Sequence, residues 1–187
     1  IDTCALSHDL GHPPFGHYGE TILNDIDNEI NFEGNAQSVR ILTKLEKKVP
    51  NVRGLNLTFR SLLGTSKYIF SENGDHDGKY LYKDDYEKLT EYSEKNDICL
   101  RTLDVQIVDI ADEIAYAAHD LEDSLSLGLF TIDEFIHELK IWLKDKYPDS
   151  NADDKLQDIV DKCRKFAYKG ESFNSSEEYS FLFKKEL

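Results

Sequence analysis

The 187-residue chain contains no methionine, a single tryptophan, four prolines and three cysteines. Cys4, Cys99 and Cys163 are widely spaced and form no Cys-x-x-Cys pattern, so neither a disulfide framework nor a thiolate zinc site is favoured. No run of about 18 apolar residues is present, and no secretory signal pattern is recognisable. We therefore expect a cytoplasmic protein that does not bind a membrane, with Cys4 as a small apolar core residue.

Basic residues are scarce, with 22 Lys and Arg against 37 Asp and Glu and a net charge of -15. Nonspecific nucleic-acid binding depends on Lys and Arg that neutralise phosphates, so this balance argues against a nucleic-acid partner. The same excess of negative charge also disfavours the binding of a triphosphate substrate. A bound divalent cation and a few placed Lys or Arg can nevertheless reverse the potential at one site.

The alternating apolar and polar runs of β-strands are absent, and almost every segment has helical periodicity. The predicted helices cover residues 21–29, 32–47, 56–68 with Asn56 as N-cap, 84–95, 103–127, 131–147, 153–168 and 175–187. Residues 71–79 contain two Gly-bearing turns and predict a surface loop. An all-α architecture follows. We assign residues 1–148 to one core and residues 149–187 to a helical extension that is not independent, with 148–151 as the linker.

Three of the six histidines lie within ten residues, in the segment His8-Asp9-Leu10-Gly11-His12-Pro13-Pro14-Phe15-Gly16-His17-Tyr18-Gly19-Glu20. Adjacent imidazole and carboxylate groups, as in His8-Asp9, can chelate one divalent cation, although a solvated helix end also fits such a pair. The Gly and Pro residues that follow are expected to stop helix propagation. We therefore expect His12, His17 and Glu20 to be presented from a rigid turn beside the pair.

A third set of polar residues recurs every four positions at Asp112, Tyr116 and Asp120, among alanines. This spacing places them on one face of a helix. Spacing alone fits a hydrated stripe as well as a binding face.

The segment His8–Glu20 resembles the core of the HD-domain phosphohydrolases, in particular the deoxynucleoside triphosphate triphosphohydrolases known as dGTPases. Asn31–Leu42 and Gln106–Asp123 resemble two further segments of that family, in the same order. The resemblance implies an HD-domain helical bundle. It also implies metal-dependent hydrolysis of a dNTP, with dGTP favoured, to deoxynucleoside and triphosphate.

The resemblance implies that His8, Asp9 and Asp112 bind the metal, with Asp109 as the fallback ligand. In the family a further histidine upstream of the His-Asp pair completes the site, and no histidine precedes His8. We therefore expect the chain to be an incomplete piece that lacks this ligand. A mixed nitrogen and oxygen ligand set suits Mn²⁺, Mg²⁺, Fe²⁺ or Co²⁺.

The resemblance also implies roles for the histidines of the loop. His17 would act as general acid or base, Glu20 would orient its ring, and His12 would hydrogen-bond a phosphate. Asn35 and Gln37 would brace the metal ligands through hydrogen bonds.

Four further residues correspond to substrate contacts of the family. Tyr116 would pack under C2′ of the sugar and exclude a 2′-hydroxyl, and Asp120 would accept from the 3′-hydroxyl. Lys67 would meet the phosphates, with Tyr68 beside it. An exposed lysine at a helix end is an equally good interpretation of Lys67.

Two other functions remain open. One is another HD phosphohydrolase, acting on a nucleoside monophosphate, a cyclic nucleotide or a guanosine polyphosphate. The other is a catalytically inactive nucleotide-sensing module, against which the joint presence of His17, Glu20 and the metal residues weighs. The resemblance further implies a homo-oligomer and, in some members, an activating nucleotide.

Overall fold

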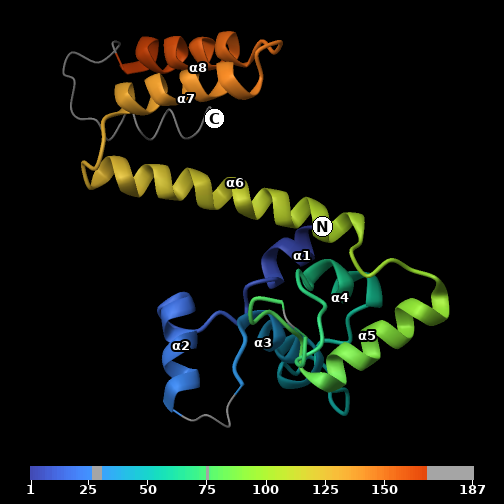
Figure 1. Cartoon of the computed structure of the whole chain (residues 1–187). Helices are drawn as coiled ribbons and strands as arrows, with labels where there is room; N and C mark the ends of the chain where they lie inside the picture. Colours follow the sequence, from blue (N-terminus) through green and yellow to red (C-terminus); the bar gives the residue numbers. More distant parts are fainter. Residues whose placement is uncertain (27–30, 75, 168–187) are drawn as a thin grey trace. The chain divides into compact units, whose positions relative to one another are not determined.

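The computed structural model describes residues 1–26, 31–74 and 76–167. Within these ranges the chain forms eight α-helices and one short π-helical turn, and the only β-type pairing is an isolated bridge between Ser71 and Leu81 (Figure 1). The all-α prediction is confirmed. None of the described helices is long and apolar enough to cross a membrane.

The chain divides into two compact units, Ile1–Asp112 and Glu113–Leu187. The division falls within one continuous helix, α6 (Leu103–Ser126). Whether residues 149–187 depend on residues 1–148 for folding stays a prediction.

Among its described residues the first unit contains five α-helices, one π-helical turn and the beginning of a sixth α-helix. They are α1 (Asp2–Ser7), α2 (Gly16–Ile26), α3 (Gly34–Arg40) with its π-helical continuation η1 (Ile41–Leu45), α4 (Phe59–Thr65), α5 (Lys83–Asn96) and the first part of α6. Helix α5 and the start of α6 lie within one residue of their predicted positions. Helix α1 was not predicted.

The start of α2 differs from the prediction. The helix begins at Gly16 instead of residue 21, so His17 and Glu20 project from its first two turns and not from a non-helical turn. Phe15 and Gly16 have φ of 65° and 59°, and this left-handed pair lets the chain reverse after Pro14 and enter the helix. At Gly19 a Cβ would lie 1.9 Å from the Pro14 carbonyl oxygen, so glycine permits the close approach. Residues 27–29 of the predicted helix lie outside the described residues.

Two other boundaries also differ. The segment predicted as one helix over 32–47 starts at Gly34, because the Glu33 carboxylate caps it by accepting from the Ala36 amide, and it widens into the π turn at residue 41. The helix predicted over 56–68 is the shorter α4. Thr58 caps it, not Asn56, whose φ of 55° is incompatible with the extended conformation of an N-cap.

The loop predicted over residues 71–79 is confirmed for the residues that the structure describes. Its ends are joined where the Leu81 amide donates to the Phe70 carbonyl at 3.0 Å. The Phe70 and His76 rings stack with centroids 3.8 Å apart.

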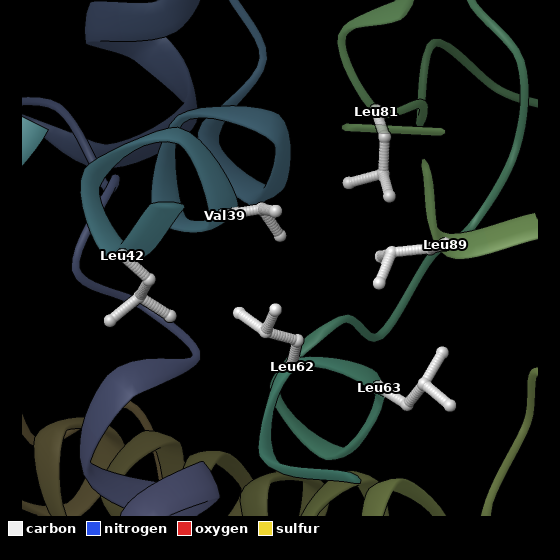
Figure 2. Packing of buried hydrophobic residues seen from close by; sticks show 6 residues of the cluster. All are labelled: Val39, Leu42, Leu62, Leu63, Leu81 and Leu89. Carbon is white, nitrogen blue, oxygen red and sulfur yellow. The ribbon is translucent and has the colours of Figure 1, made fainter. Parts of the chain in front are cut away.

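The core of the first unit gathers leucines and a valine from α3, η1, α4, α5 and the segment before α5 (Figure 2). Its buried members are Val39, Leu42, Leu62, Leu63, Leu81 and Leu89. Burying each such side chain stabilises the fold by roughly 1.5–3 kcal/mol. This core fixes α3 and α4, the two helices on which the candidate site rests.

Helix α1 is attached to α4. Cys4 is buried, as predicted, and a Cβ on Gly64 would lie 2.6 Å from its Sγ, so glycine allows the two helices to touch. The hydroxyls of Ser7 and Thr65 hydrogen-bond at 3.0 Å. This contact holds the end of α1, where His8 follows, against the end of α4, where Lys67 follows.

The second unit comprises the remainder of α6, α7 (Ile132–Lys146) and α8 (Ala152–Ala167). Thr131 and Glu134 form a capping box at the start of α7. Ile136, Leu156 and Val160 form the buried core. The predicted helices 131–147 and 153–167 are confirmed, while residue 168 and the predicted helix 175–187 lie outside the described residues.

Candidate metal centre and active site

His8 directly follows α1, and its ring is held in one orientation. Its Nδ1 lies 2.8 Å from the Ala5 carbonyl oxygen, which can only accept, so Nδ1 carries the ring proton and a neutral ring has its lone pair on Nε2. Nε2 is buried and has no hydrogen-bond partner. It lies 3.4 Å from Asp9 Oδ2 and 3.3 Å from Asp112 Oδ1. A histidine nitrogen bound to a backbone carbonyl, with the opposite nitrogen facing carboxylates, is typical of a metal ligand.

One ligand atom from each of His8, Asp9 and Asp112 lies within 4.8 Å of the other two. The structure therefore brings together the three residues predicted to bind the metal. Asp109, the fallback ligand, is not in this group. Its carboxylate instead contacts Lys67 and Arg101.

The loop after the His-Asp pair lies directly on α3. The Gly11 amide donates to Ser38 Oγ at 2.9 Å, and Ser38 Oγ lies 2.8 Å from the His8 carbonyl oxygen, to which it donates. A Cβ on Gly11 would lie 2.3 Å from the Gly34 carbonyl oxygen and the Ser38 nitrogen. Sequence reasoning missed Ser38. The only sequence signal for Ser38 was its position next to Val39 in a predicted helix, where a buried hydroxyl needs a hydrogen-bond partner.

His17 and Glu20 form a pair three residues apart near the start of α2. His17 Nδ1 lies 3.2 Å from Glu20 Oε2, and the His17 side chain is 73% exposed while that of Glu20 is 14% exposed. The His12 ring lies 5.3 Å from the His17 ring, and His12 Nδ1 lies 3.9 Å from Asp9 Oδ1. The three histidines of the motif thus follow one another from the carboxylate cluster toward solvent.

Lys67 is not an exposed lysine, because its side chain is only 12% exposed. Nζ lies 2.8 Å from Asp112 Oδ2 and 3.1 Å from Asp109 Oδ1. Burial by itself would lower the Lys67 pKa, but the hydrogen bonds to Asp112 and Asp109 outweigh it and the pKa is raised. Burial likewise opposes the charge on Asp112, yet Lys67 keeps the pKa of Asp112 below its usual value. The carboxylate is therefore charged, as a metal ligand must be.

The remaining predicted residues are less closely tied to this cluster. Tyr68 lies beside Lys67, with its ring centroid 5.9 Å from Nζ. Asn35 donates to Glu33 Oε1 at 2.7 Å and not to a predicted metal ligand. Tyr116 and Asp120 lie on α6 in the second unit, so their contact with a substrate stays a prediction. The role of Gln37 likewise stays a prediction.

Glu33 is a further residue that sequence reasoning did not single out. It is 1% exposed, caps α3, and pairs with Lys79 Nζ at 3.3 Å. A buried glutamate between Phe32 and Gly34 could be recognised only from the cap that it forms.

Comparison with known proteins settles the family. The model of the HD domain matches residues 1–117, which include the His8-Asp9 pair and Asp112. The chain belongs to the HD domain family. The family resemblance drawn from the three sequence segments is therefore confirmed.

Two similar proteins are both named as deoxyguanosinetriphosphate triphosphohydrolase-like. The chain is 46% identical over its whole length to deoxyguanosinetriphosphate triphosphohydrolase-like protein 2 of Vibrio cholerae serotype O1, and the match covers 46% of that protein. It is 39% identical, over 86% of its length, to the deoxyguanosinetriphosphate triphosphohydrolase-like protein of Rickettsia bellii, of which 42% is matched. The chain spans less than half the length of these relatives.

The residues present fit a divalent metal ion. The buried, unpartnered His8 Nε2 and two carboxylates offer the nitrogen and oxygen atoms that Mn²⁺, Mg²⁺, Fe²⁺ and Co²⁺ accept. Cys4, the nearest cysteine in sequence, contacts the Ser61 carbonyl and is not part of the cluster.

Proposed function

We propose that the protein hydrolyses deoxynucleoside triphosphates, with dGTP favoured, to deoxynucleoside and triphosphate. The observation that carries the proposal is the cluster of His8, Asp9 and Asp112, with its unpartnered nitrogen, beside the His17–Glu20 pair. The cluster supports a divalent ion and the pair supports proton transfer. The names of the relatives supply the substrate class.

His8, Asp9 and Asp112 would hold the ion, which supplies Lewis acidity toward a phosphoryl oxygen. Glu20 accepts from His17 Nδ1, leaving Nε2 to exchange a proton with the substrate. In the proposed reaction the oxygen of water bonds to the α-phosphorus and the bond from that phosphorus to O5′ breaks. His17, protonated on Nε2 from solvent, delivers that proton to O5′ of the leaving deoxynucleoside, and the attacking water gives up one proton to solvent. His12 donates to a phosphate oxygen.

Positive charges at the site would allow this acidic chain to bind a triphosphate. Asp9, Asp109 and Asp112 are offset by Lys67, Arg101 and the two positive charges of the ion. Lys67 is 2.8 Å from Asp112, so its ammonium also lies where it can attract a phosphate near the ion. The net charge of -15 therefore does not determine the potential at the site.

Selectivity for deoxyribose is proposed to come from Tyr116 and Asp120, four and eight residues after Asp112 in α6. We expect the full-length protein to hydrolyse dGTP and to leave GTP nearly untouched. A 2′-hydroxyl that clashes or stays buried without a partner costs about 1–3 kcal/mol or more, so kcat/KM for GTP should be at least roughly 5- to 150-fold below that for dGTP. Tyr116→Ala should narrow the gap between the two nucleotides, as measured by kcat/KM for each.

Tyr116→Phe is the matched control, because it retains the ring and should retain the preference. Equal turnover of GTP by the unmodified protein would remove the deoxyribose argument. It would favour the alternative of an HD phosphohydrolase for a signalling nucleotide such as a guanosine polyphosphate. Homo-oligomerisation and activation by a nucleotide stay predictions.

A further inference from the structure

A row of alternating charges leads away from the candidate metal ligand Asp112. Lys67 Nζ contacts both Asp112 and Asp109, and Arg101 Nη2 donates to the far oxygen of Asp109. The side chains of Lys67, Asp109 and Asp112 are 12%, 17% and 13% exposed, whereas Arg101 is 53% exposed. The row therefore runs from solvent at Arg101 to the buried face of the cluster.

Each carboxylate in this row uses its two oxygens differently. Asp112 directs Oδ2 to Lys67 at 2.8 Å and Oδ1 toward His8 Nε2 at 3.3 Å. Asp109 directs Oδ1 to Lys67 at 3.1 Å and Oδ2 to Arg101. Asp109 is therefore held through both carboxylate oxygens. Asp112 is held through Oδ2 alone, and its Oδ1 faces the unpartnered His8 Nε2.

Lys67 by itself could not hold Asp112. A lysine ammonium is a point charge on a flexible stem, with three donors that rotate freely. Asp109 supplies the second acceptor that restrains it, and Asp109 is in turn restrained by the planar guanidinium of Arg101. Asp109 and Asp112 are three residues apart on α6 and would repel each other without the cation between them.

We propose that Arg101 and Asp109 are positioning residues that act through Lys67 to direct Asp112 Oδ1 toward the metal site. Asp109 is then a restraint on Lys67 and not a metal ligand. The inference rests on the proposed metal-dependent function. It assigns to Arg101 and Asp109 a role that the family resemblance does not assign to them.

Removal of Arg101 distinguishes this role from a simple effect of charge. If only the electric field mattered, losing a positive charge would strengthen the binding of a cation. If Arg101 restrains Asp109, its loss lets Lys67 move toward Asp109 and leaves Asp112 less well oriented, so cation binding weakens. The two accounts predict changes of opposite sign.

The experiment is calorimetric titration of Mn²⁺ into metal-stripped full-length protein. Arg101→Gln should raise the Mn²⁺ Kd about 10-fold, and Asp109→Asn should raise it about 10- to 100-fold, the range for residues that orient metal ligands. Arg101→Lys keeps the charge and should restore most of the affinity. Circular dichroism should show that these variants remain folded.

Arg60→Gln is the matched control. Arg60 makes a two-point ion pair with Asp104, also on α6, with Nε and Nη2 at 2.7 and 3.0 Å from the two carboxylate oxygens. This pair does not involve Lys67, Asp109 or Asp112. Its loss should leave the Mn²⁺ Kd unchanged.

Two outcomes of the titration have different meanings. An unchanged or lower Mn²⁺ Kd in Arg101→Gln would overturn the positioning role. The metal site itself would still stand if Mn²⁺ binds to the unmodified protein and not to Asp112→Asn. If the unmodified protein binds Mn²⁺ no better than Asp112→Asn does, the proposed metal-dependent function fails. The positioning role then fails with it.

Discussion

Replacing Asp112 by asparagine in the full-length protein is expected to lower kcat/KM for dGTP by about 10³-fold or more. A metal ion contributes several kcal/mol of charge stabilisation to a phosphoryl transition state, and each 1.4 kcal/mol is about tenfold in rate. The variant replaces the charged carboxylate by a neutral amide at a position 3.3 Å from His8 Nε2, within a cluster of three ligand residues. The measurement is steady-state turnover at saturating Mn²⁺ together with the Mn²⁺ Kd.

Glu113→Gln provides the control for Asp112→Asn. Glu113 is the next residue of α6 and is exposed, so its replacement removes the same charge without removing a ligand. Activity and Mn²⁺ affinity should be retained in that variant. A fully active Asp112→Asn protein would show that this carboxylate does not bind the catalytic metal.

Replacing His17 by alanine should lower kcat by roughly 10²-fold or more while leaving KM for dGTP and the Mn²⁺ Kd little changed. His17 is largely exposed and its Nδ1 contacts Glu20, so the ring can exchange a proton through Nε2 and is not needed to build the carboxylate cluster. The separation of kcat from metal binding is the informative result, because a merely structural defect would alter both.

Tyr18→Phe is a suitable comparison for His17→Ala, because Tyr18 is the exposed neighbour of His17 on α2 and has no proposed role. His12→Gln should mainly raise KM, as expected of a phosphate contact. An unchanged kcat in His17→Ala would show that His17 is not the general acid or base. The proposed role of Glu20, which is to orient the His17 ring, would fail with it.

The sequence predicted the long helices well because their apolar periodicity extends over many turns. The predicted span 103–127 corresponds to α6 at Leu103–Ser126, and the span 131–147 corresponds to α7 at Ile132–Lys146. Short elements depend more on local contacts. Helix α2 starts at Gly16 although glycine disfavours helices, because the reversal at Phe15 and the contact between Gly19 and Pro14 require it.

The convergence of His8, Asp9 and Asp112 could be predicted from the motifs, although Asp112 is more than 100 residues from the pair. The contacts around the cluster could not be predicted from the sequence. The position of Lys67 between Asp109 and Asp112 depends on how α4 ends against α6, which no local pattern records. The contact of Ser38 with the His8 carbonyl depends in the same way on the packing of α3.

The most direct test of the proposed activity is product analysis with dGTP and the unmodified full-length protein, stripped of metal and then supplied with Mn²⁺. Phosphorus NMR and chromatography of the nucleoside distinguish the products. We expect deoxyguanosine and inorganic triphosphate in equal amounts with Mn²⁺, and no turnover without a divalent ion. Formation of dGMP with pyrophosphate, stepwise release of phosphate, or equal turnover in the absence of metal would contradict the proposed reaction.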